Sequence, residues 1–313
     1  MSFSEDVAKG LSGEQKKLPS KYFYDADGDR LFQEIMKMPE YYLTNSEYEI
    51  FSTKAEAILK AMGVNSGAFN LVEFGAGDGF KTKVLIERML ELEAQLTYAP
   101  IDISKDVLDQ LEENFLERFP GLNINPQNAD YFEALERLGS VSDLPKLVLF
   151  IGSSIGNFSR DQSIDFLKTL NTKLRKGDKL LIGFDLRKNP KIILDAYNDR
   201  EGITKAFNLN LLKRINRELG GKFDVEAFDH YPLYDPEAGL AKSYIVSLKE
   251  QDVYIESCQK TFHFGAGEAI HTEISRKFSV AEIEEIAEKS GFVVTEHFFD
   301  CRHYYVNTLI ELV

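Results

Sequence analysis

The chain has 313 residues, of which 43% are hydrophobic and 28% are charged, and this composition is typical of a globular protein rather than a disordered or fibrous one. Its formal net charge of −14 repels the phosphate backbone of nucleic acids, and no dense run of Lys and Arg offsets it, so we expect no nucleic-acid partner. No apolar stretch is long enough for a membrane helix and the amino terminus lacks signal-peptide features, so we expect a cytoplasmic protein that does not bind membranes.

Metal and disulfide chemistry are not expected either. The chain has 2 cysteines, Cys258 and Cys301, which lie far apart in sequence and suit a reducing compartment. The 5 histidines form no H-x-x-x-H pair of the kind that binds zinc on a helix. We therefore expect no bound metal.

The first fifty residues do not have the pattern of a sheet, but they contain two aromatic clusters. One is Tyr22-Phe-Tyr-Asp25 and the other is Pro39-Glu-Tyr-Tyr-Leu-Thr44. Tyrosine is an amphipathic contact group that holds ligands with little loss of entropy. Most of these rings are expected to dock the segment onto the rest of the protein, which leaves a few for a ligand.

The most informative motif follows a strand predicted at residues 70–74. Gly75, Gly77 and Gly79 have the spacing G-x-G-x-G, and glycines let a ligand approach main-chain N–H groups. Dinucleotide folds prefer G-x-G-x-x-G, and Asp78 would repel the pyrophosphate of NAD. The cationic sulfonium and ammonium groups of S-adenosylmethionine (SAM) suit this acidic residue better. We therefore expect SAM here and disfavour a dinucleotide oxidoreductase.

From about residue 69 to residue 185, short apolar runs alternate with longer amphipathic segments, which indicates βαβ units and a parallel sheet. Because the carboxyl ends of parallel strands meet at one edge, residues that follow these strands should lie together. We expect strands at 70–74, 96–103, 146–151 and 179–184, a weaker strand near 122–125, and helices at 81–92, 104–119 (capped by Ser104) and 161–174.

Polar side chains follow three of these strands. Asp102 ends the second strand, where an acidic residue commonly accepts hydrogen bonds from ribose hydroxyls. Asp130 and Tyr131 could contact adenine, although a helix cap and a packing ring explain them equally well. Asn157 follows the small residues after Ile151 and offers an amide donor and acceptor for an amino-acid head group, although a lone Asn in a glycine-containing turn is common.

The carboxyl-terminal tail predicts a helix at 279–289 and strands at 293–299 and 304–312, joined by a turn so short that the strands must be antiparallel. This hairpin, combined with the glycine motif, favours an α/β fold of the class I methyltransferase (Rossmann-like) type, with a mostly parallel sheet and an antiparallel C-terminal hairpin.

Residues from about 190 to 277 do not fit this sheet. They predict a helix at 203–219 and strand-like runs at 240–248, 253–258 and 270–278. In the last run Glu273 and Ser275 share one face of a strand, where they could hold the two nitrogens of an imidazole, although solvated charge is the usual explanation. We expect a cofactor domain formed by 50–189 and 278–313, and a discontinuous α+β substrate-binding domain formed by 1–49 and 190–277.

Taken together, these segments resemble the histidine Nα-methyltransferase family of ergothioneine biosynthesis over nearly the whole chain. The stretches that carry the resemblance are Leu18-Pro-Ser-Lys-Tyr-Phe-Tyr-Asp25, Pro39-Glu-Tyr-Tyr-Leu-Thr44, Gly152-Ser-Ser-Ile-Gly-Asn157, Gly183-Phe-Asp-Leu186, Ala196-Tyr197, Ala206-Phe-Asn208 and Thr272-Glu-Ile-Ser275. Several of them lie outside the glycine motif, so the resemblance is more specific than that to methyltransferases in general.

The resemblance implies two sets of site residues. The set expected to line the SAM site is Gly75, Lys81, Asp102, Asp130 and Tyr131, with Tyr24 near both ligands. The set expected to line the amino-acid pocket is Tyr41, Gly152, Asn157, Tyr197, Glu273 and Ser275, in which Asn157 and Tyr197 hold the head group and Glu273 and Ser275 hold the imidazole. One position departs from the family: Ser243 stands in the pocket where histidine-specific relatives often carry Met.

The resemblance implies trimethylation of the α-amino group of L-histidine to hercynine, with S-adenosylhomocysteine (SAH) as the other product. Asn157 would hold the amine, and Tyr24 or a water would remove its proton. A relative acting on tryptophan or another aromatic amine would keep Asn157 and Tyr197 but lose Glu273. A nonenzymatic SAM-binding protein is a further alternative, whereas a DNA methyltransferase is disfavoured because residues 130–132 lack a Pro-Pro motif. We expect a monomer acting on a small molecule.

Overall fold

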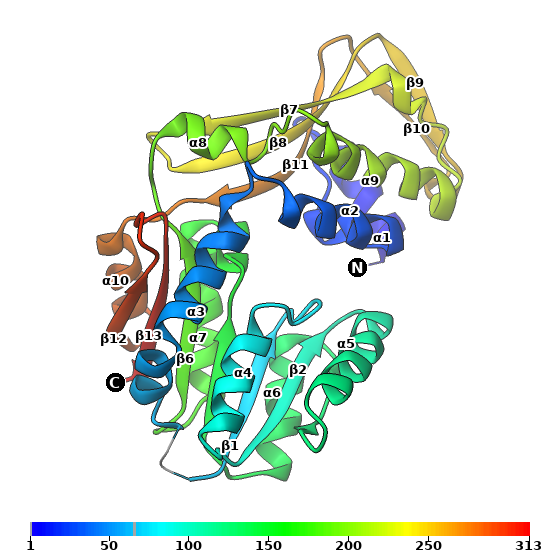
Figure 1. The fold of residues 1–313 in the computed structure, drawn as a ribbon. Helices are drawn as coiled ribbons and strands as arrows, with labels where there is room; N and C mark the ends of the chain where they lie inside the picture. Colours follow the sequence, from blue (N-terminus) through cyan, green and yellow to red (C-terminus); the bar gives the residue numbers. More distant parts are fainter. Residues whose placement is uncertain (1, 65–66) are drawn as a thin grey trace. The chain divides into compact units, whose positions relative to one another are not determined.

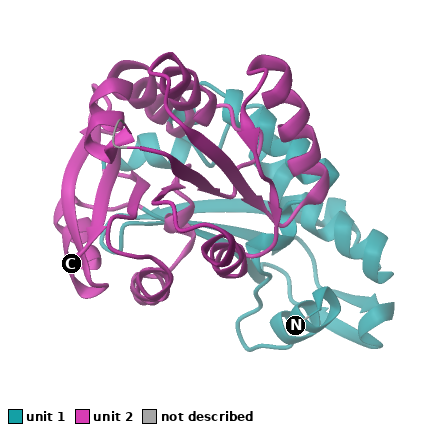
Figure 2. Ribbon diagram, turned by 90° about the horizontal axis from the view of Figure 1, so that it is seen from below, with its two compact units in different colours: residues 1–42, 188–276 teal, residues 43–187, 277–313 magenta. Residues whose placement is uncertain are grey.

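The computed structural model describes residues 2–64 and 67–313, and Figure 1 traces their helices and strands. The chain divides into two compact units, each made of two separate stretches of sequence (Figure 2). Unit 1 comprises residues 1–42 and 188–276, and unit 2 comprises residues 43–187 and 277–313. Each unit has its own apolar core, which is typical of a structural domain.

Unit 2 is built on a mostly parallel sheet in the order β12-β13-β6-β5-β1-β2-β3, with the short β4 also pairing with β2. Strand β13 runs antiparallel to both β6 and β12, whereas the other strand pairs in this sheet are parallel. This topology confirms the predicted fold class. The strands are β1 (Phe69–Phe74), β2 (Leu96–Asp102), β3 (Asn123–Ile124), β4 (Gln127–Asn128), β5 (Lys146–Phe150), β6 (Lys179–Asp185), β12 (Phe292–Phe299) and β13 (Tyr305–Leu312).

Several helices of unit 2 begin at capping residues that the sequence provides. Ser104 caps α5 by accepting a hydrogen bond from the amide of Val107, as predicted, and Ser159 and Ser279 begin α7 and α10 with capping boxes. The helices are α3 (Tyr42–Met62), α4 (Thr82–Glu91), α5 (Lys105–Arg118), α6 (Tyr131–Val141), α7 (Arg160–Lys173) and α10 (Val280–Lys289). In the part of the chain that the structure describes, no helix is long and apolar enough to span a membrane.

The chain passes between the two units at three places, and the ends of unit 2 at two of them, near residues 187 and 277, lie next to each other. The amide of Phe278 donates to the carbonyl of Asp185 at 2.9 Å, and the amide of Arg187 donates to the carbonyl of Phe278 at 2.9 Å. Beside them the Lys277 ammonium and the Asp185 carboxylate form a 2.8 Å ion pair whose side chains are both fully buried. Since an unpaired charge would be costly at such a site, the two partners depend on each other.

Unit 1 combines helices with two small antiparallel sheets. Strands β11-β8-β7 form one sheet and β10-β9 form the other. The apolar faces of α1 and α9 contribute to a core that also includes Phe23, Phe228 and Phe264. The elements are α1 (Phe3–Leu11), α2 (Ala26–Lys37), α8 (Pro190–Asp195), α9 (Ile203–Leu219), β7 (Phe228–Asp235), β8 (Leu240–Ser247), β9 (Gln251–Ile255), β10 (Lys260–Phe264) and β11 (Ala269–Arg276).

Most predicted elements are confirmed within a few residues, including the long α9 and the carboxyl-terminal hairpin. The weak strand expected near 122–125 is only two residues long, and a second two-residue strand, β4, follows it. Residues 256–258, expected to extend a strand, form a short 3-10 helix after β9. Helices α1 and α2 and strands β7 and β10 were not predicted.

Candidate functional site

The glycine-rich loop begins where β1 ends. All six residues of β1 are buried, and the chain then takes left-handed conformations at Gly75 (φ 62°) and Gly79 (φ 61°). A Cβ on Gly79 would lie 2.4 Å from the ring of Phe115, so no other residue fits there without movement. Gly75 is exposed, and this leaves main chain accessible at the carboxyl edge of the sheet.

Asp102 lies beside this loop at the end of β2. Its Oδ1 accepts a hydrogen bond of 3.0 Å from the amide of Ser104. Burial raises the pKa of the Asp102 carboxyl, while the amides of Ser104 and Gly77 favour its charged form. The β1–β2 pairing therefore brings a partly buried carboxyl group next to the glycine-rich loop, as the sequence predicts for a ribose-binding residue.

Asp130 and Tyr131 begin α6 on the same edge. Asp130 is the helix cap, and its Oδ1 accepts hydrogen bonds of 3.0 Å from the amides of Phe132 and Glu133. The ring of Tyr131 stacks on Phe74 with centroids 4.6 Å apart, and burial raises its pKa to about 12. The Tyr131 hydroxyl lies 3.2 Å from the position that a Cβ on Gly75 would take, so this neutral donor borders the glycine-rich loop.

The loop after β5 carries the candidates for the amino-acid head group in unit 2. Gly152 (φ 75°) and Ser153 (φ 59°) both have positive φ, and a 3-10 helix, η3 (Ser154–Asn157), follows them. The hydroxyl of Ser153 accepts a 3.2 Å hydrogen bond from the amide of Asp185, which anchors the turn to β6. Asn157 ends η3 with an exposed side chain, so its amide is accessible to a ligand.

Lys81 also lies at this edge of the sheet. It forms an ion pair with a residue that the sequence did not mark as part of the site. Its ammonium donates to Oε2 of Glu47, a fully buried residue of α3, and the amide of Gly152 donates to the same oxygen at 2.9 Å. Glu47 is 34 residues from Lys81 in sequence, and no motif marks it among the ten acidic residues of the first fifty. Only the fold shows which carboxylate meets Lys81.

In unit 1, the residues expected to read the amino-acid side chain lie on one face of a small sheet. Glu273 on β11 pairs with Ser243 on β8, and Ser275 pairs with Ala241. Because positions 241 and 243 are two residues apart on β8, these side chains share a face. A β-bulge between His271 and Glu273 shifts the register just before them, which re-aims the side chains that follow.

A histidine that sequence reasoning did not single out lies on the same face. His230 on β7 pairs with Ile245 of β8, two residues from Ser243. Burial lowers the pKa of His230 to about 4, so its imidazole is neutral at physiological pH. This face therefore combines a neutral imidazole with the carboxyl group of Glu273.

Three of the four candidate tyrosines, Tyr24, Tyr41 and Tyr197, belong to unit 1. Tyr24 and Tyr41 both make edge-on ring contacts with Phe32, at centroid distances of 5.7 Å and 6.4 Å. Tyr24 is 41% exposed, and its carbonyl accepts a 3.1 Å hydrogen bond from Arg214. Tyr197 follows α8 and is half-buried. Unit 1 thus places Tyr24 and Tyr41 around one phenylalanine, and Tyr197 on a different element.

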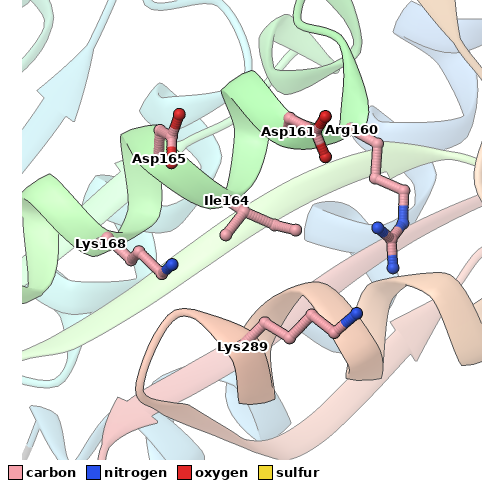
Figure 3. A pocket seen from close by; sticks show the side chains of 6 residues that line it. All are labelled: Arg160, Asp161, Ile164, Asp165, Lys168 and Lys289. Carbon is pink, nitrogen blue, oxygen red and sulfur yellow. The ribbon is translucent and has the colours of Figure 1, made fainter.

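A surface hollow elsewhere in unit 2 contains none of the candidate residues. It lies between α7 and α10, and the side chains that line it are Arg160, Asp161, Ile164, Asp165, Lys168 and Lys289 (Figure 3). Arg160 and Lys289 both pair with Glu285, so these charges neutralise one another at the surface. Within residues 2–64 and 67–313, no cluster of His, Cys, Asp and Glu is arranged to hold a metal ion.

Comparison with known proteins gives a match over almost the whole chain. A family model described as histidine-specific methyltransferase, SAM-dependent, matches residues 3–312. The chain is 37% identical over 284 residues to a protein of Mycolicibacterium smegmatis named histidine N-alpha-methyltransferase, with 90% of this chain and 87% of the relative covered. It is 33% identical to the protein of that name in Mycobacterium tuberculosis, covering 89% and 85%. It is 28% identical to ergothioneine biosynthesis protein 1 of Schizosaccharomyces pombe, covering 88% of this chain and 36% of the relative.

Proposed function

This chain belongs to the histidine-specific, SAM-dependent methyltransferase family, and from that premise we propose that it methylates the α-amino group of L-histidine. Three transfers give Nα,Nα,Nα-trimethylhistidine (hercynine), and each releases one SAH. The observation that carries the proposal is the family match over residues 3–312, which spans both units rather than the cofactor motif alone.

Unit 2 is proposed to hold the cofactor. SAM supplies an electrophilic methyl group on a cationic sulfonium. The glycine-rich loop offers main chain at Gly75, Asp102 accepts from the ribose hydroxyls, and Tyr131 lies against the adenine. Asp130 is proposed to contact the adenine amine while Oδ1 caps α6. Lys81 is a cation suited to the carboxylate of SAM.

Unit 1 is proposed to select the amino acid. The carboxyl group of Glu273 accepts a hydrogen bond from one imidazole nitrogen, and the hydroxyl of Ser275 fixes the tautomer at the other. Ser243, directly opposite Glu273, borders the ring. In this unit Tyr197 is proposed to hold the head group and Tyr41 to line the amino-acid pocket. Among the residues of unit 2, Asn157 is proposed to hold the head group and Gly152 to line the pocket.

The residues of the chain have little covalent chemistry to perform. The α-amino group of free L-histidine is mostly protonated near neutral pH, so a proton must leave it, to Tyr24 or to a water, before the first transfer. Catalysis then depends on holding the neutral lone pair about 3 Å from the methyl carbon. The uncharged amide of Asn157 suits repeated methylation, because it can both donate and accept as the substrate loses its N–H groups.

The proposal is tested by incubating the protein with SAM and L-histidine, or its Nα-methyl and Nα,Nα-dimethyl forms, and following SAH release and product mass. We expect all three to be converted to trimethylhistidine. Asn157→Ala should lower kcat/KM for each of them. An unchanged kcat/KM in this variant would contradict the role given to Asn157.

Ser243 favours one rival, a methyltransferase of the same family acting on tryptophan or another aromatic amine. A serine where relatives often carry a larger side chain leaves room for a larger ring, whereas Glu273 favours imidazole. A SAM-binding protein without activity is the other rival, and it predicts binding of SAM without any release of SAH. We further propose that the enzyme works as a monomer in the cytoplasm, a reducing compartment that suits the free thiols of Cys258 and Cys301.

A further inference from the structure

Glu47 contacts two candidate site residues, Lys81 and Gly152, and belongs to neither candidate set. Its side chain is 0% exposed, and that of its partner Lys81 is 16% exposed. The same carboxylate oxygen, Oε2, accepts from the Lys81 ammonium and from the Gly152 amide. It therefore ties α3 to the start of α4 and to the loop that follows β5.

The contacts leave little freedom to either donor. Lys81 Nζ lies 3.4 Å from the position that a Cβ on Gly152 would take, so the ammonium sits against the main chain of that loop. The second oxygen of Glu47, Oε1, is buried beside Gly183, where even a methyl group would lie 2.4 Å from it. A carboxylate enclosed on both sides holds its partners in one geometry.

The charge of Glu47 matters for the ligand as well as for the geometry. A lysine ammonium attracts the carboxylate of SAM but repels its sulfonium, and the mostly buried position of Lys81 strengthens both effects. Glu47 carries the opposite charge to Lys81, so the ion pair has no net charge. SAH lacks the positive charge of the SAM sulfonium, because its sulfur is a neutral thioether.

We propose that Glu47 is a positioning residue that fixes Lys81 and the Gly152 amide and, by cancelling the charge of Lys81, lets the site favour the cationic methyl donor over the neutral thioether product. This inference rests on the proposed SAM site of unit 2. It does not depend on which amino acid accepts the methyl group.

The test is the ratio of SAM affinity to SAH affinity, measured by titration calorimetry on the full chain without any acceptor. Glu47→Gln keeps the shape of the side chain and leaves Lys81 uncompensated, so SAM should bind about tenfold more weakly while SAH loses less than about threefold. Lys81→Met removes the positive charge that compensates Glu47. The remaining negative charge should raise the ratio of SAM affinity to SAH affinity. The double variant has no charge at the pair and should return the ratio close to that of the unmodified protein.

Asp178→Asn is the matched control. Asp178 is also a buried carboxylate of unit 2, but it accepts from the amides of Lys146 and Arg175 at the opposite edge of the sheet. Its replacement should lower the melting temperature and leave the SAM to SAH ratio unchanged. Should Glu47→Gln not fold, Lys81→Met and the double variant still decide the question.

Equal losses of SAM and SAH affinity in Glu47→Gln, or an unchanged ratio in Lys81→Met, would overturn the inference. Histidine methylation is read in a separate assay. A protein that shows the expected ratios but does not methylate histidine would refute the proposed function and leave the role of Glu47 standing.

Discussion

Glu273 and Ser243 lie directly opposite each other on neighbouring antiparallel strands, β11 and β8, so their side chains project from the same face of the sheet. Side chains at such paired positions are close enough to contact one ligand group together. A carboxyl group beside a small hydroxyl provides space and a hydrogen-bond acceptor at the same place. This arrangement suits a flat, polar ring such as imidazole.

The first prediction concerns this pair. Glu273→Ala removes the acceptor proposed for the imidazole N–H, so kcat/KM for L-histidine should fall about a hundredfold while SAM affinity stays the same. Steady-state kinetics and calorimetry measure the two quantities. Glu226→Ala, at an exposed position of the same unit, is the control and should change neither. Unchanged histidine kinetics in Glu273→Ala would show that the carboxyl group does not read the substrate.

The second prediction concerns Asp102. Asp102→Asn keeps the acceptor for the Ser104 amide but loses the charge proposed to accept from ribose hydroxyls. SAM and SAH share the ribose, so both should bind about ten to a hundred times more weakly. Calorimetry with each ligand tests this, with the exposed Asp106→Asn as control. If SAM alone lost affinity, the carboxylate would be sensing the sulfonium rather than the ribose.

The third prediction is a pH dependence of stability that arises at Glu73. This buried side chain accepts a 2.7 Å hydrogen bond from the hydroxyl of Thr82 and another from Tyr98, and burial raises its pKa from 4.5 to about 7. The folded state thus holds the proton more tightly than the unfolded chain. The resulting stabilisation is complete below pH 4.5 and is lost as the pH rises to about 7.

Glu73→Gln resembles the protonated side chain and should not show this loss. Relative to the variant, the unmodified protein should lose about 3 kcal/mol of unfolding free energy between these pH values. Urea unfolding across the range measures the difference. Parallel pH profiles for the two proteins would mean that the pKa of Glu73 is the same in the folded and unfolded states.

The fourth prediction concerns Gly183 on β6. A Cβ there would lie 2.4 Å from Oε1 of Glu47 and 2.4 Å from the hydroxyl of Tyr305. Gly183→Ala should therefore cost about 1–3 kcal/mol of stability and weaken SAM binding by displacing Glu47. Thermal unfolding and calorimetry provide the two readings.

Gly139→Ala is the matched control for that substitution. Gly139 lies within α6, and no atom would come within 4 Å of its Cβ. Alanine is favoured over glycine in a helix, so this variant should be as stable as the unmodified protein or about 1 kcal/mol more stable. A Gly183→Ala protein with normal stability and normal SAM affinity would show that the strand shifts to accommodate the methyl group.

The sheet of unit 2 could be predicted because its signals are local. Strand β1 is a short apolar run that stops at glycines, and the caps of α5, α7 and α10 are serines with the expected spacing. Strand β7 could not be predicted in this way, because Pro232 interrupts it. The structure tolerates this proline because β7 is an edge strand.

The positions of candidate site residues that directly follow parallel strands could be predicted from the sequence. Asp102 and Tyr131 lie at the carboxyl edge because parallel strands deliver them there. Asp130 shows the limit, since an acidic residue before a helix has the same pattern whether it caps the helix or binds a ligand, and here it caps α6. The contact between Glu47 and Lys81 depends on tertiary packing of α3, which no spacing in the sequence encodes.

The most direct test of the account is a competition among acceptors. The protein is incubated with SAM and an equimolar mixture of the twenty amino acids, and the methylated products are identified by mass. We predict trimethylated histidine as the dominant product, formed with SAH in a ratio of about one to three. Methylation of tryptophan or tyrosine but not of histidine would contradict the proposed function. Binding of SAM with no methylated amino acid at all would contradict it as well.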